Sequence, residues 1–328
     1  MKVLVTGSSG FVGSHLVPSL QSRGHQVVGI DRRKPAVSEP DVFIQGDLLS
    51  SDVLKREIQG VDAIYHLAAA KDDWGISREE FFRENVDVTK AVLEASVRES
   101  IDTHIFYSTV AVHGPGEEST DESAPYNPTI AYGESKVECE KLYKKFAEEH
   151  SSARILLLRP SAIYGAEQPW RTNVYRLIDA IYKDRFIMIG DGNAVKTTSY
   201  IENLLAATHF LAGRLQKGVQ EYIYVDEPVM STDTLVRYIY RHMGKTQPRW
   251  SLPLGLVKPL AYVADVAADL TGIDFPITAA RIEKFCTSTN FDASAIRDLG
   301  FEQPVDNEKA VEKTVEWQLA HFKNRQAE

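Results

Sequence analysis

Tyr132 and Lys136 form a Tyr-x-x-x-Lys pair near the middle of the chain. On a helix this spacing puts both side chains on one face, where the lysine ammonium can stabilise a tyrosine phenolate. A tyrosine held in this way can move a proton to or from a sugar or alcohol hydroxyl near neutral pH. The pair is not specific by itself, because a surface helix can carry the same spacing by chance.

A glycine-rich turn at the start of the chain could hold a dinucleotide. It has the spacing Gly-x-x-Gly-x-x-Gly, follows the apolar run Val3–Val5 directly and precedes a helical pattern. Glycines let the backbone approach a pyrophosphate closely, and a helix N-terminus offers free N–H groups and a positive dipole end. The expected cofactor contacts in this turn are Gly7, Gly10, Phe11, Val12 and Gly13.

Asp31 ends the second predicted strand, eighteen residues after Gly13. A carboxylate at that point can accept hydrogen bonds from the adenosine ribose hydroxyls, and it repels a 2′-phosphate. The sequence therefore favours NAD over NADP, although Arg32 and Arg33 follow at once and reduce this preference. We also expect Arg32 to contact the cofactor.

Short apolar runs alternate with helical patterns through the first half of the chain. Continuous apolar strands imply a sheet that is covered on both faces, and strand–helix alternation implies parallel crossovers. The sequence thus predicts an α/β fold, a doubly wound parallel (Rossmann) sheet with a smaller, mostly helical C-terminal lobe. The predicted strands are Val3–Val5, Val27–Ile30, Val42–Ile44, Ala63–Leu67, His104–Tyr107 and Arg154–Leu158, and the clearest helices are Phe81–Glu99 and Ile130–His150.

The regular alternation ends at Gly165, after which turn-forming residues cluster. We expect residues 1–165 to form the cofactor-binding domain and residues 200–225 to return to it. Residues 166–199 and 226–328 would then form the substrate lobe.

Ser108 and Thr109 end the predicted strand that comes before the helix of Tyr132. In a doubly wound sheet these residues meet at the carboxyl edge, where the reactive ring of a dinucleotide lies. A hydroxyl there can hydrogen-bond the reacting oxygen beside the tyrosine.

The composition excludes several classes of protein. The 328 residues are 43% apolar and 25% charged and carry a net charge of −9, without the basic tail that nucleic-acid binding would favour. No stretch has the ~20 predominantly apolar residues of a membrane span. Two cysteines, Cys139 and Cys286, are too few for a disulfide framework, so we expect reduced thiols in the cytoplasm. The nine histidines are scattered and suggest no metal site.

Taken in order, these motifs resemble the extended short-chain dehydrogenase/reductases, specifically the NAD-dependent sugar epimerase/dehydratase branch. The resemblance covers the chain from its first residues to Gly165. It rests on Thr6–Gly13, Asp31, Gly46–Leu48, His66–Ala69, Asn85–Val86, Tyr107–Gly114, Tyr132–Lys136 and Arg159–Gly165.

The resemblance implies a role for each matching residue. Thr109, Tyr132 and Lys136 would be catalytic, with Tyr132 as acid/base and Lys136 gripping the nicotinamide ribose. The other implied cofactor contacts are Asp47 and Leu48 beside the adenine, Leu67, Ala68 and Ala69 along the phosphates and ribose, Ser108 beside Thr109, and Pro160 and Ile163 near the carboxamide.

Departures from the family pattern narrow the reaction and the substrate. Sugar dehydratases carry Asp-Glu directly after the catalytic threonine, whereas this chain has Val110 and Ala111, so dehydration is not expected. Lys196 stands where many relatives place an arginine that holds the nucleotide diphosphate, and Thr109 would also contact the substrate. Asn173 and Arg281 are the other candidate diphosphate contacts.

The resemblance therefore implies an NAD-dependent 4-epimerase of a UDP-hexose or UDP-N-acetylhexosamine. A UDP-4-keto-sugar reductase, a 3β-hydroxysteroid dehydrogenase-like enzyme and a non-enzymatic redox sensor are the alternatives. Family members often pair through two helices, which here are Phe81–Glu99 and Ile130–His150. We accordingly expect a homodimer. Leu93, Val97, Val137 and Leu142 give these helices apolar positions that could serve either the core or a partner.

Overall fold

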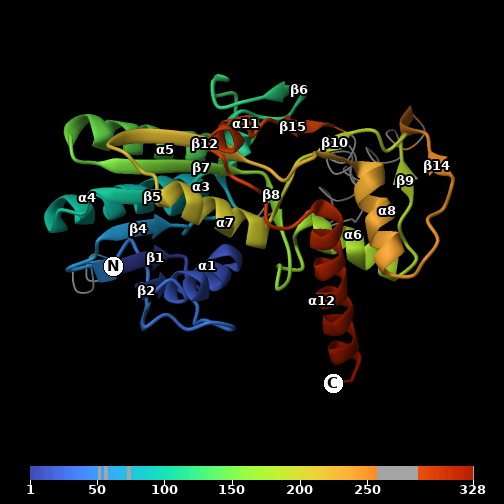
Figure 1. The fold of residues 1–328 in the computed structure, drawn as a ribbon, viewed down its shortest axis with the longest axis horizontal. Coiled ribbons are helices and arrows are strands. Elements are labelled where there is room, and N and C mark those ends of the chain that lie inside the picture. The colour runs from blue at the N-terminus through green and yellow to red at the C-terminus, as the bar shows by residue number, and fades with distance from the viewer. Residues whose placement is uncertain (51–52, 55–57, 72–74, 256, 258–286, 328) are drawn as a thin grey trace.

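The computed structural model describes residues 1–50, 53–54, 58–71, 75–255, 257 and 287–327. Their central element is a seven-stranded sheet in the order β12-β7-β5-β4-β1-β2-β3 (Figure 1). Every neighbouring pair in it is parallel, which confirms the predicted doubly wound architecture. The strands are β1 (Lys2–Thr6), β2 (Gln26–Asp31), β3 (Val42–Gln45), β4 (Ala63–His66), β5 (Thr103–Tyr107), β7 (Arg154–Pro160) and β12 (Gly218–Tyr224).

Helices cover both faces of this sheet. On one face, α1 (Phe11–Gln21) and α7 (Ile201–Ala212) pack on a core that includes Val5 and Leu158. On the other face, α4 (Val88–Glu99) packs on Leu4, and α5 (Ala131–Glu149) packs on Leu157. Successive strand residues point to opposite faces, which is why these strands are apolar throughout.

The predicted helix over residues 81–99 consists of three parts. It begins with the short α3 (Arg78–Phe81), whose N-terminus is capped by a capping box between Ser77 and Glu80. A π-helical segment, Phe82–Asp87, follows and leads directly into α4. A π-helical turn changes the direction in which neighbouring side chains point, and such turns are frequent at functional sites.

Short strands link the sheet domain to the C-terminal lobe. A four-stranded sheet has the order β13-β10-β15-β6, so β6, from the first half of the chain, lies beside strands of the second half. Two further pairs, β11–β8 and β14–β9, are parallel. The strands are β6 (Gly116–Thr120), β8 (Ala162–Tyr164), β9 (Met188–Ile189), β10 (Val195–Lys196), β11 (Thr198–Tyr200), β13 (Met230–Ser231), β14 (Ser251–Leu252) and β15 (Thr289–Phe291).

The rest of the described lobe is mainly helical, as Figure 1 shows. Among the helices of the described residues, none is both long and apolar enough to cross a membrane. The remaining helices are α6 (Asn173–Tyr182), α8 (Thr232–His242), α11 (Ser294–Asp298), α12 (Asn307–Ala327) and the 3-10 turn Val110–Val112.

Candidate active site

The glycine turn between β1 and α1 is too tightly packed to accept side chains at two of its positions. Gly7 has φ +71°, and a Cβ there would lie 2.8 Å from the backbone nitrogen of Ala68. A Cβ on Gly13 would lie only 2.3 Å from the carbonyl oxygen of Gly7. The glycines thus allow the turn, the start of α1 and the loop after β4 to lie against one another.

The N-terminus of α1 is open for an anion. Gly10 is its N-cap residue and supplies no side-chain hydrogen bond to the first turn. The first backbone N–H groups of a helix have no partner within the helix, and its dipole favours negative charge there. This open end and the narrow glycine cradle beside it fit the pyrophosphate of NAD.

Asp31 is fixed at the end of β2, where a dinucleotide ribose would lie. Its carboxylate accepts hydrogen bonds from the backbone N–H of Ser9 at 3.1 Å and of Arg33 at 2.9 Å. The side chain of Arg32, the next residue, is held by two carboxylates. Its guanidinium donates to Asp47 at 2.9 Å and forms an ion pair with Glu84 at 2.5 Å.

The loop after β4 lies against the glycine turn. The hydroxyl of Thr6 accepts from the backbone N–H groups of Leu67 and Ala68, both at 3.2 Å. Asn85, from the π-helical segment, accepts from the backbone N–H of Ala70 at 2.7 Å and donates to the hydroxyl of Ser135 at 2.8 Å. One amide therefore ties this loop to the first turns of α5. Leu67, Ala68 and Ala69 are half-buried, and Leu48 is buried.

The three predicted catalytic residues lie on elements that meet at the carboxyl end of the sheet. Thr109 follows β5, and Tyr132 and Lys136 lie on the first two turns of α5. Thr109 and Tyr132 are half-buried, so the structure leaves part of each exposed. The Tyr132 ring packs 6.1 Å from the Phe81 ring, measured between centroids.

Lys136 is buried, with only 2% of its surface exposed. Its ammonium donates to the carbonyl of Tyr107 at 2.7 Å and lies 4.3 Å from the centre of the Phe106 ring. Burial lowers the pKa of Lys136 to about 8, because a charged ammonium is poorly solvated there.

Ser108 has a partner that the sequence did not predict. Its hydroxyl is buried and donates to the carboxylate of Glu140 at 2.5 Å. That carboxylate also accepts from the hydroxyl of Tyr126 at 2.7 Å and from two nitrogens of Arg159, at 2.9 and 2.6 Å. The proton of Ser108 is thus directed toward a buried carboxylate, and its role at the cofactor stays a prediction.

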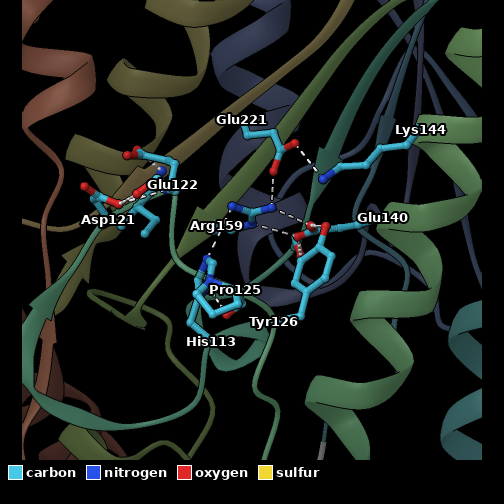
Figure 2. A network of polar contacts seen from close by, with 12 residues as sticks. His113, Asp121, Glu122, Pro125, Tyr126, Glu140, Lys144, Arg159 and Glu221 are labelled. Carbon is cyan, nitrogen blue, oxygen red and sulfur yellow. Dashed lines mark hydrogen bonds and ion pairs between the residues drawn. The ribbon is translucent and has the colours of Figure 1, made fainter.

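The cluster around Arg159 was not foreseen from the sequence. Figure 2 shows the guanidinium between Glu140 and Glu221, with the ring of His113 at 3.3 Å. Burial alone would raise the pKa of Glu140, but hydrogen bonds from Arg159, Ser108 and Tyr126 bring it below its ordinary value. The only sequence signal was the helical spacing that puts Glu140 one turn beyond Lys136.

The remaining predicted contacts lie on the lobe side of the sheet. Pro160 ends β7, and the half-buried Ile163 lies in β8 opposite Ser199 of β11. Lys196 lies in β10, and its ammonium donates to the carbonyl of Thr287 at 2.5 Å. Asn173 is the exposed first residue of α6. Arg281 and Cys286 lie outside the described residues, which themselves contain no cluster suited to a metal ion.

Residues 3–225 match the sequence profile of the NAD dependent epimerase/dehydratase family. The chain belongs to this family. It is therefore an NAD-dependent enzyme, and the predicted membership of the extended short-chain dehydrogenase/reductases is confirmed.

Similar proteins cover the whole chain. The N-acetyl-α-D-glucosaminyl-diphospho-ditrans,octacis-undecaprenol 4-epimerase of Escherichia coli O157:H7 is 29% identical over 322 residues, 98% of this chain and 96% of its own. A 3β-hydroxysteroid dehydrogenase/Δ5→4-isomerase of Mycobacterium tuberculosis is 26% identical and covers 100% of this chain and 93% of its own. The crystal structure of UDP-glucuronic acid 4-epimerase from Bacillus cereus with NAD shares the fold, with a TM-score of 0.79, 24% identity and coverage of 98% and 100%.

Proposed function

We propose that this enzyme inverts C4 of a hexose or N-acetylhexosamine that is linked through a diphosphate. The observation that carries the proposal is the match to a 4-epimerase along 98% of this chain, which includes the lobe. This chain also has Thr109, Tyr132 and Lys136, the residues that the reaction needs. The sheet domain alone would not support it, because the whole family shares that part.

The chemistry assigned to the chain is proton transfer and orientation. The Tyr132 phenolate removes the proton of the C4 hydroxyl, and the buried ammonium of Lys136 stabilises the negative charge of the phenolate. The hydroxyl of Thr109 donates to the same sugar oxygen and holds it beside Tyr132. NAD, held by the glycine turn and Asp31, would supply a reversible hydride acceptor for C4, which is what inversion at that carbon requires. Tyr132 then gives its proton back to the oxygen.

The residues after Thr109 support epimerisation over dehydration. Val110 and Ala111 lie in the 3-10 turn that Thr109 caps by accepting from the backbone N–H of Ala111 at 3.2 Å. Neither side chain can carry a proton, so this turn lacks the acid and base that elimination at a neighbouring carbon needs.

For the substrate we propose two carriers with the same diphosphate chemistry, uridine and a polyprenol. Residues 166–199 and 226–328 would bind the carrier, and residues 1–165 with 200–225 would bind NAD. Lys196, Asn173 and Arg281 are the proposed diphosphate contacts. Lysine supplies the charge, without the two-pronged geometry of arginine.

The proposal is tested by following C4 inversion by NMR. The purified protein is given NAD and UDP-glucose, UDP-N-acetylglucosamine or N-acetylglucosaminyl-diphospho-undecaprenol in detergent. We expect inversion of at least one, and a loss of about 10²-fold or more in kcat for Tyr132→Phe. Tyr143→Phe, on the same helix but with a buried hydroxyl that has no hydrogen-bond partner within the described residues, serves as the matched control with unchanged kcat. No inversion of any substrate, or a fully active Tyr132→Phe protein, would contradict the proposal.

Alcohol oxidation is a second candidate, because the steroid dehydrogenase of M. tuberculosis also matches the full chain. The two reactions differ in their use of the cofactor. An epimerase regenerates NAD in every cycle, whereas a dehydrogenase accumulates NADH and a 4-keto-sugar reductase consumes NAD(P)H. Absorbance at 340 nm during turnover on a 3β-hydroxysteroid, a UDP-sugar and a UDP-4-keto sugar separates the three.

A further inference from the structure

Arg32 is held between two carboxylates at the edge of the cofactor site. The same terminal nitrogen of its guanidinium lies 2.9 Å from Asp47 and 2.5 Å from Glu84. Asp47 follows β3, whereas Glu84 belongs to the π-helical segment, which comes after the β4 loop in the chain. Two different elements therefore converge on one arginine.

Glu84 is the more firmly held of the two carboxylates. Its side chain is 14% exposed, against 45% for Asp47. Its other oxygen accepts two hydrogen bonds from Arg83, at 3.0 and 2.7 Å, so it is fixed from both sides. The π-helical turn puts Glu84 toward Arg32 while its neighbour Asn85 reaches the loop at Ala70.

The position of Arg32 connects these ion pairs to the choice between NAD and NADP. It directly follows Asp31, the carboxylate placed to bind the adenosine ribose, so a free guanidinium at this point could bind a 2′-phosphate. We propose that Glu84 is a specificity-determining residue for NAD over NADP, which acts by holding Arg32 in an ion pair and away from a 2′-phosphate. It is a positioning residue, since it works through Arg32.

The expected size of the effect follows from the exposure of the pair. Arg32 is 50% exposed, and solvent-accessible ion pairs contribute at most about 1 kcal/mol, or roughly fivefold in a binding constant. Asp31 and Asp47 remain in place when Glu84 is changed, so the preference for NAD should become weaker without reversing.

The test is calorimetric titration of the apoprotein with NAD and with NADP. For Glu84→Gln we expect the ratio of the two dissociation constants, NADP over NAD, to fall by roughly threefold to fivefold, mainly through tighter NADP binding. Glu84→Asp keeps the charge and should keep the ratio within about twofold of the original. Glu79→Gln removes an equal charge from the exposed helix α3 and should leave the ratio unchanged.

A double-substitution cycle shows whether Arg32 transmits the effect. In an Arg32→Ala background, Glu84→Gln should no longer change the ratio. An unchanged ratio for Glu84→Gln in the original protein would overturn the proposal. An equal change with and without Arg32 would also overturn it, because Glu84 would then act by its charge alone. Circular dichroism melting of each variant confirms that the folded protein is being titrated.

Discussion

Lys136 is more deeply buried than its proposed role in a polar reaction suggests. Its ammonium contacts a backbone carbonyl and an aromatic face, and neither neutralises its charge. The surroundings therefore favour the neutral amine, and burial brings its pKa down to about 8, close to physiological pH. A lysine on an exposed helix would keep its charge well above that value.

This burial predicts an alkaline limit to activity. Lys136 is charged below its pKa and neutral above it, so support for the Tyr132 phenolate should be lost as pH rises through about 8. We expect kcat to fall with a midpoint near that pH while the fold persists, as measured by initial rates from pH 6 to 10 alongside circular dichroism. A kcat that stays constant up to pH 10 would show that the charge of Lys136 does not matter.

Single residues were predictable where chemistry demands them at a fixed spacing. Tyr132, Lys136 and the glycine turn belong to this class, because their spacing follows from helix and turn geometry. The hydrogen bond of Ser108 and the ion pairs of Arg32 do not belong to it. They depend on Glu140 and Glu84, which are far along the chain and are brought close only by the finished fold.

At the scale of elements, the Glu140–Arg159 pair joins α5 to three strands. Glu140 belongs to α5, Arg159 lies in β7, and Glu221 lies in β12 (Figure 2). Ser108, which donates to Glu140, follows β5. The same cluster also contacts the segment between Thr109 and Tyr132 at two points. Arg159 contacts His113 near the start of this segment, and Glu140 accepts from Tyr126 nearer its end.

Removing Glu140 should leave the buried Arg159 with only the partly exposed Glu221 beside it, among the described residues, and should leave the hydroxyls of Ser108 and Tyr126 without this acceptor. We expect Glu140→Ala to lower the free energy of unfolding by about 3–5 kcal/mol, as for other broken buried ion pairs. Glu140→Gln keeps the shape and some of the hydrogen bonds and should cost less, and Glu138→Gln, on the outer side of the same helix, should cost almost nothing. Urea unfolding measures all three, and equal stability of Glu140→Ala and the original protein would disprove a structural role for the pair.

Elements were predictable to the extent that their own residues determine them. Apolar runs such as Val27–Ile30 and Arg154–Leu158 became β2 and β7, because a strand buried on both faces must be apolar along its length. The strands β6 and β10 gave no such signal. They are short or polar, and their partners lie up to about 170 residues away.

At the scale of the whole molecule, the structure separates the apolar positions that serve the core from one that is open to a partner. Leu93 and Val137 are buried within the protomer, whereas Val97 is 52% exposed on α4. We still expect a dimer that pairs through α4 and α5, with Val97 at the contact. Light scattering should give twice the 36.7 kDa chain mass, and Val97→Glu should shift it toward the monomer. A single 36.7 kDa species for the original protein would contradict the pairing.

The place of β12 in the sheet also sets an order for synthesis on the ribosome. This strand, at residues 218–224, pairs with the edge of β7, which ends at residue 160. In the same way, β6 pairs with β15, which is synthesised much later, at residues 289–291. Once α5 and β7 have emerged, the nascent chain therefore exposes the unpaired backbone of β7 until some 60 more residues follow. Another chain can add to such an edge. Slow translation between β7 and β12 should raise the fraction of chain that aggregates, and slow translation after β15 should not.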